Sequence, residues 1–90
     1  MAEIFDGFVG RTVVLDMTSR HVFLGVLAEV HPDHVVLDTV DVHDLRDTGT
    51  TKDLYVMETA RHGVRENRRR VRVSRCEIVA VSALEDVIVF

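Results

Sequence analysis

Apolar and polar positions alternate along most of the chain, and this alternation predicts short β-strands. Valine and other β-branched residues fill these stretches and favour extended backbone. Turn-forming residues separate the stretches, so we expect consecutive antiparallel strands in a strongly bent sheet or small barrel. The predicted strands are residues 11–17, 21–30, 34–42, 54–59, 69–74 and 78–84.

The N-terminal segment has a different spacing. Four apolar residues recur at positions i, i+1, i+4 and i+5, which places them on one face of a helix: Ile4, Phe5, Phe8 and Val9. Gly10 follows them, and glycine commonly ends a helix. We therefore expect a short N-terminal helix before the first strand.

The second predicted strand, residues 21–30, is apolar on both faces. It is therefore expected to be covered on both sides or sharply curved. Gly25 lies in its middle, where the missing side chain permits tight bending or close approach of another backbone. The turn that follows contains Pro32, which fixes φ, and Asp33, which can bond the backbone beyond it.

The remaining segments are predicted as connections. The polar stretch 43–53 is expected to be a loop, and residues 62–63, 66–67 and 75–77 are expected to be turns. The tail, residues 86–90, ends in four apolar residues, so we expect it to dock on its own domain or on a neighbour.

Composition changes the picture through charge and size. The 90 residues allow a single domain, 1–90, and the formal net charge is −4. Residues 61–75 nevertheless hold seven arginines and one acid, a local balance of +6. The apolar runs are too short to span a bilayer, and MAEIFDGFVG lacks the basic start of a signal peptide. We therefore expect a soluble, cytoplasmic protein that does not contact membranes.

The arginine segment supports two interpretations. Arginine offers phosphate a fixed fork of donors, so a basic cluster is typical of a nucleic-acid surface. Arginines that alternate with Val71 and Val73 also form the solvated face of an amphipathic strand. In that case they would pair with the abundant acids within or between subunits, including Asp38, Asp41, Asp44 and Asp47.

Other candidate chemistry is weaker. His31 and His34 flank Asp33, but two histidines without cysteines or a second cluster favour a hydrogen-bonded turn over a metal site. Cys76 follows an arginine, yet no histidine is adjacent to it, and we expect a buried or half-buried structural cysteine. The four aspartates do not match a calcium loop and are interpreted as solubility. No catalytic motif is present, so we predict no enzyme, cofactor, catalytic residue or metal.

At this point the chain resembles the Sm-like (Lsm) family, whose members have an N-terminal helix and a strongly bent five-stranded sheet and assemble as rings. The resemblance lies in the patterns of four segments. Residues 8–15 look like the family's helix end and first strand, and residues 23–27 look like its glycine-containing second strand. Residues 31–37 and 71–81 occupy the places of its two sequence motifs. His31 and His34 replace the family's aspartate and asparagine, Ser74-Arg75 replaces its Arg-Gly pair, and the stretch 43–68 is longer than usual.

The resemblance implies a homo-oligomeric ring in which the strand at residues 68–74 pairs with the strand at residues 78–84 of a neighbour. It also implies contacts to single-stranded RNA from the pore loops, with phosphate contacts from the arginine hairpin. The RNA-binding residues expected on this basis are His31, His34, Arg75, Arg65, Arg68, Arg70 and Arg72. The alternative is a structural or protein-interaction oligomer whose arginines bridge subunits without RNA. A dimeric barrel of the OB-like kind fits the strand count almost as well.

Overall fold

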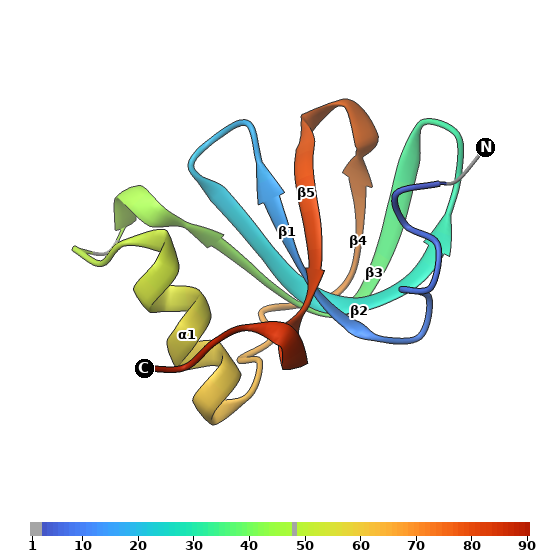
Figure 1. The fold of residues 1–90 in the computed structure, drawn as a ribbon. Helices are drawn as coiled ribbons and strands as arrows, with labels where there is room; N and C mark the ends of the chain where they lie inside the picture. The colour runs from blue at the N-terminus through green and yellow to red at the C-terminus, as the bar shows by residue number, and fades with distance from the viewer. Residues whose placement is uncertain (1–2, 48) are drawn as a thin grey trace.

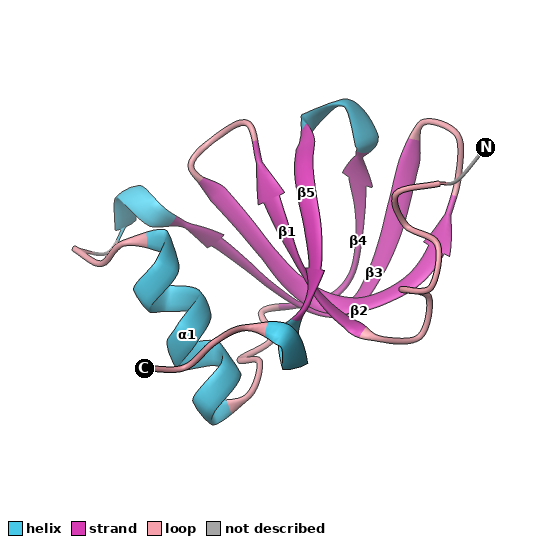
Figure 2. Cartoon of the chain, viewed as in Figure 1, coloured by secondary structure: helices cyan, strands magenta, loops and turns pink. Residues whose placement is uncertain are grey.

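A computed structural model describes residues 3–47 and 49–90. It contains five strands and one α-helix (Figures 1 and 2). The elements are β1 (Thr12–Met17), β2 (His21–Val30), β3 (His34–Asp44), α1 (Lys52–His62), β4 (Arg68–Ser74) and β5 (Ile78–Ala83). Three short 3₁₀ turns follow β3, β4 and β5 in that order: η1 (Leu45–Asp47), η2 (Arg75–Glu77) and η3 (Leu84–Asp86). The predicted mainly-β architecture is confirmed.

The five strands form one antiparallel sheet in the order β4-β3-β2-β1-β5. The last strand therefore lies beside the first, and β4 and β5 are the two edges. Among the described strands these two do not pair with each other, so the sheet is open rather than a closed barrel. Figure 1 shows how β2 and β3 curve along their length.

Gly25 lies at a close approach between β2 and β3, as predicted. A Cβ atom at this position would lie 3.0 Å from the carbonyl oxygen of Asp38 and 3.2 Å from that of Thr39. The pairing of β2 with β3 shifts register between Leu24 and Val26. Thr39 itself has φ of 54°, which is uncommon for a residue with a branched side chain. The close approach of β2 and β3 at this position therefore leaves little room for a side chain.

Side chains pack on both faces of the sheet, which confirms that β2 is covered on both sides. On one face Leu27 joins Leu15 and Leu37 in a buried cluster that also includes Phe5. On the other face Leu24 packs in a second cluster, with Val14, Val22 and Val56 of α1.

The predicted N-terminal helix is wrong. Residues 4–7 form turns, in which Asp6 N donates to Glu3 O and Phe8 N donates to Phe5 O. These bonds span three residues rather than the four of an α-helix. Gly7 adopts φ of 83° in the middle of the segment, which interrupts a right-handed helix. Phe5 alone becomes fully buried, and the segment covers one end of the first cluster.

The predicted strand at residues 54–59 is also wrong, because these residues belong to α1. The hydroxyl of Thr51 accepts a hydrogen bond from Leu54 N at 3.2 Å and caps the helix start. Gly63, with φ of 88°, ends the helix. Val56 and Thr59 are the buried residues, and their separation of three positions fits a helix rather than a strand.

The C-terminal tail docks on its own domain through part of its length. Val87 packs against the second cluster, and Phe90 N lies 3.3 Å from the sulfur of Met57. The side chains of Ile88 and Phe90 stay exposed, at 73% and 91%. Within the described residues, no helix is long and apolar enough to cross a membrane.

Candidate functional site

The turn between β2 and β3 brings two predicted site residues together. The rings of His31 and His34 stack with centroids 4.4 Å apart. His31 Nε2 donates to Glu29 Oε1 at 2.7 Å, and His34 Nδ1 donates to Asp33 Oδ1 at 2.6 Å. These hydrogen bonds hold the pKa of Glu29 and the pKa of Asp33 below their usual values. The turn is hydrogen-bonded, and no metal-binding group of three suitable side chains occurs among the described residues.

Arg70 and Arg72 of β4 lie beside the two histidines. The two histidines and the two arginines line a pocket of about 260 Å³ together with Glu29 and Val36, and we call it the histidine pocket. Arg70 Nε donates to Asp38 Oδ1 at 2.7 Å, and Arg70 Nη2 lies 3.5 Å from Glu29 Oε2. Within residues 3–47 and 49–90, no hydrogen-bond or ion-pair partner is found for the side chain of Arg72. Arg72 is therefore the available cation of this pocket.

Arg75 is engaged inside the molecule. Its Nη1 donates to the carbonyl oxygen of His31 at 2.9 Å, and its Nη2 pairs with Glu3. The guanidinium carbon also lies 5.2 Å from the ring centroid of Phe5. With its side chain 24% exposed, Arg75 ties the η2 turn to the histidine turn and to the N-terminal segment.

The other two predicted residues lie elsewhere. Arg68, at the start of β4, donates to the carbonyl oxygen of Asn67. Arg65 lines a separate pocket of about 190 Å³ with Asp41 and Tyr55. The seven predicted RNA-binding residues therefore do not form one surface, and only His31, His34, Arg70 and Arg72 share a pocket.

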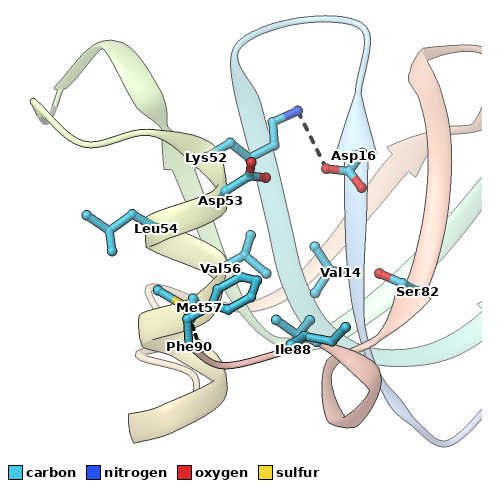
Figure 3. A pocket seen from close by; sticks show the side chains of 11 residues that line it. Val14, Asp16, Lys52, Asp53, Leu54, Val56, Met57, Ser82, Ile88 and Phe90 are labelled. Carbon is cyan, nitrogen blue, oxygen red and sulfur yellow. Dashed lines mark hydrogen bonds and ion pairs between the residues drawn. The ribbon is translucent and has the colours of Figure 1, made fainter.

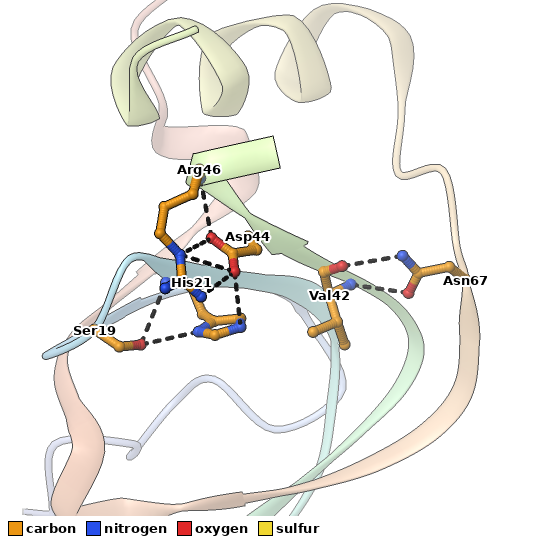
Figure 4. A network of polar contacts seen from close by, with 6 residues as sticks. All are labelled: Ser19, His21, Val42, Asp44, Arg46 and Asn67. Carbon is orange, nitrogen blue, oxygen red and sulfur yellow. Dashed lines mark hydrogen bonds and ion pairs between the residues drawn. The ribbon is translucent and has the colours of Figure 1, made fainter. Parts of the chain in front are cut away.

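A buried carboxylate was missed by the sequence analysis. Asp41 is 4% exposed and accepts hydrogen bonds from the Tyr55 hydroxyl and, at 3.4 Å, from Asn67 Nδ2. Burial, together with this hydrogen bond, raises the pKa of Tyr55 well above its usual value. Asn67 also bonds the backbone N and O of Val42 (Figure 4). The available signal was the position of Asp41 between two valines, Val40 and Val42.

Three of the four aspartates therefore make specific contacts, which the solubility interpretation did not include. Asp38 pairs with Arg70, which is the predicted pairing within a subunit. Asp44 accepts from Arg46 N at 2.9 Å and from Arg46 Nε at 3.0 Å, and this arginine lowers the pKa of Asp44 (Figure 4). His21 Nε2 lies 3.8 Å from the same carboxylate, which links β2 to the end of β3.

Cys76 is exposed, so the predicted buried or half-buried cysteine is wrong. It lies in the η2 turn between β4 and β5. Its sulfur lies 3.1 Å from the hydroxyl oxygen of Ser74.

A larger pocket lies between α1, the sheet and the tail (Figure 3). Its volume is about 360 Å³, and we call it the helix pocket. Its lining is mostly apolar, with three charged side chains: Val14, Asp16, Lys52, Asp53, Leu54, Val56, Met57, Ser82, Val87, Ile88 and Phe90. No residue of the sequence-predicted RNA site contributes to it.

A family model described as "Domain of unknown function (DUF2642)" matches residues 1–43, which is less than half of the chain. No curated protein matches the sequence.

Two crystal structures of the NatC complex contain a chain of similar fold. For the complex bound to Gag peptide and CoA, the TM-score is 0.54 at 20% identity, and the match covers 82% of each chain. For the complex bound to CoA, the TM-score is 0.58 at 19% identity, covering 97% of this chain and 91% of the other. At such low identity the likeness concerns the fold alone.

Proposed function

We propose that this chain is an assembly module of the Sm-like kind, in which β4 of one copy pairs with β5 of the next. The partner is a second copy of the same chain. The contact joins two different edges, so it is heterologous and generates a ring when the rotation between copies closes. The observation that carries the proposal is the pair of unpaired edge strands in one open antiparallel sheet.

The two edges match in length, and each contributes an apolar side chain to the same buried cluster. β4 has seven residues and β5 has six. Val71 of β4 and Val81 of β5 both pack against the same buried cluster. A long edge that carries apolar side chains is prone to pair with another strand. Edge-to-edge pairing would extend this cluster across the boundary between copies.

The two edges also carry opposite charge. β4 holds four arginines in its first five positions, of which Arg68, Arg69 and Arg72 have no ion-pair partner within the part of the chain that the structure describes. Acidic residues flank β5, with Glu77 before it and Glu85 and Asp86 after it. Opposite charges on the two edges favour the heterologous contact over pairing of two identical edges.

Native mass measured across a concentration series tests the proposal. We expect a defined oligomer, and a strictly monomeric chain at high concentration would contradict it.

Two charge-reversed variants sharpen the test. R68E/R69E/R72E leaves β4 with Arg70 alone, which already pairs with Asp38, and makes both edges acidic, whereas E85R/D86R makes both basic. Each variant alone should lose assembly through like-charge repulsion, and their mixture should restore it, because opposite edges then meet again. Failure of the mixture to assemble would argue against β4–β5 pairing.

A second candidate function is binding of single-stranded RNA at the histidine pocket. The observation that favours it is the stacked pair of histidine rings beside the available Arg72. Binding should weaken with salt, because phosphate contacts release counterions.

A fluorescent single-stranded RNA titrated at several salt concentrations tests this candidate. Arg72→Ala should lower the slope of log affinity against log salt by about 0.7. Arg68→Ala, on the same strand but outside the pocket, is the matched control. Absence of binding at low salt would eliminate the candidate.

A further inference from the structure

The helix pocket is formed where α1 and the tail incompletely cover one face of the sheet. Val14 of β1 and Val56 of α1 form its inner wall, and both belong to the buried second cluster. Ser82 of β5 contributes a small side chain, which leaves space at the sheet side. Figure 3 shows these residues facing the space between the helix and the strands. At about 360 Å³, the pocket falls within the range of small-molecule sites.

The rim of the helix pocket exposes apolar side chains that would gain from being covered. Leu54 is 45% exposed, Ile88 is 73% exposed and Phe90 is 91% exposed. All three line the pocket. A ligand with an apolar body would remove this surface from water, at about 25 cal/mol for each Å² buried.

The charged groups at the mouth determine which apolar ligand fits. Asp16 and Asp53 contribute two carboxylates, and Lys52 contributes one ammonium group. Lys52 Nζ lies 3.5 Å from Asp16 Oδ1, so the ammonium group of Lys52 pairs with the carboxylate of Asp16 (Figure 3). Asp53 has no ion-pair partner in the part of the chain described by the structure. The mouth thus has a net negative charge, as does the whole chain at −4.

We propose that the helix pocket binds a small organic amine, whose apolar body packs against Val14, Val56 and Ile88 while its ammonium group pairs with Asp53. The pocket supplies the two features that such a ligand needs, an apolar wall and an unpaired carboxylate at the mouth. A ligand with a carboxylate head would meet two carboxylates and would have to displace Asp16 from Lys52. Ser82 is the one lining residue on an edge strand, whereas Asp53, which carries the charge test, lies on α1. Native mass measured for each variant therefore distinguishes a loss of ligand binding from a loss of assembly.

The probes are octylamine, octanol and octanoate, which share one apolar body and differ in head charge. Each is titrated below its aggregation concentration, and binding is followed by NMR shifts of the methyl groups of Val14, Val56 and Met57. We expect the tightest binding for octylamine and the weakest for octanoate. Equal affinity for the three probes, tighter binding of octanoate, or shifts that spread over the surface without involving these methyl groups would overturn the proposal.

Variants separate the two parts of the site. Asp53→Asn should weaken octylamine about three- to fivefold, as expected for a partly exposed ion pair, and leave octanol unchanged. Asp47→Asn removes an exposed aspartate outside the pocket and should change the affinity for neither octylamine nor octanol.

Ser82→Phe should fill the pocket and abolish binding of all three probes. If Ser82→Phe does not fold, Val56→Ala, which enlarges the pocket, provides the second measurement through altered affinity for octanol. Octylamine binding that persists unchanged in Asp53→Asn would show that the ammonium group does not use this carboxylate.

Discussion

Tyr55 is the only tyrosine of the chain, and its hydroxyl donates to a carboxylate that the sheet and α1 bury together. The ring also stacks on that of His43, with centroids 3.8 Å apart. One side chain of α1 thereby contacts β3 at two points. Because no tryptophan is present, the optical signal of this residue reports on that contact without interference.

Tyr55 should ionise at higher pH in the folded protein than in the unfolded chain. Burial and the Asp41 carboxylate both disfavour tyrosinate and raise the pKa above 10. The stabilisation that comes from this shift is present below pH 10 and is lost as pH rises through the folded pKa. Absorbance of tyrosinate during alkaline titration measures the midpoint, with the urea-unfolded chain as reference. Asp41→Asn should lower the midpoint, and a native midpoint near 10 would contradict the contact.

Gly25→Ala should destabilise the protein by about 1–3 kcal/mol. The added methyl group would meet backbone oxygens of Asp38 and Thr39, which cannot move as a flexible side chain would. Gly49→Ala is the matched control, because nothing lies within 4 Å of a Cβ atom there. Urea unfolding of both variants measures the difference. Equal stabilities would show that the sheet bends without requiring a glycine at this position.

At the scale of elements, α1 is the part that differs most from the sequence-based expectation. Leu54 to Thr59 alternates as a strand would, but good helix formers surround it and Thr51 precedes it as a cap. The capping signal was local and available, whereas the alternation was too short to decide between strand and helix. For the N-terminal segment the error was the reverse, because a helix was predicted where the structure has turns. The apolar spacing suits a helix, but Gly7 interrupts it.

Thr51→Ala should cost about 1 kcal/mol of unfolding free energy, because Leu54 N loses its capping acceptor. Thr50→Ala changes the neighbouring threonine outside the cap and serves as the control. Chemical unfolding followed by circular dichroism measures both variants. A loss of the same size in the control would mean that the hydroxyl of Thr51 does not cap the helix.

The sheet strands and their turns could be predicted, since β2 runs from His21 to Val30 as expected and β4 and β5 differ by one residue each. The candidate site could be predicted only in part. His31 and His34 lie three positions apart in one turn, so their proximity could be predicted from the sequence. The engagement of Arg75 with Glu3 links residues 72 positions apart, and no local pattern carries such a contact.

At the scale of the whole molecule, the sheet has a buried cluster on each face, and the N-terminal segment completes one of them. Phe5 is 1% exposed although the segment around it has no regular structure. The buried Phe5 ring holds the N-terminal segment against the cluster. Arg75, which directly follows β4, contacts this ring and so connects the segment to the end of β4.

Phe5→Ala should therefore reduce the unfolding free energy by about 3–5 kcal/mol, the range for deleting a buried phenylalanine side chain. Ile4→Ala, at the adjacent residue, should change it by less than about 0.5 kcal/mol because Ile4 is 56% exposed. Thermal or urea unfolding distinguishes the two. Comparable small losses would indicate that the segment does not contribute to the cluster.

The strand order has a consequence for biosynthesis. β1, β2 and β3 follow one another and can pair as soon as they leave the ribosome, but β1 receives its second partner only when β5 emerges, since Val13 pairs with Ala83. Throughout translation of the intervening residues, β1 presents an unpaired edge to solvent or to other nascent chains. Polysomes that carry neighbouring nascent chains would therefore bring several such edges together before any of them has received its own last strand.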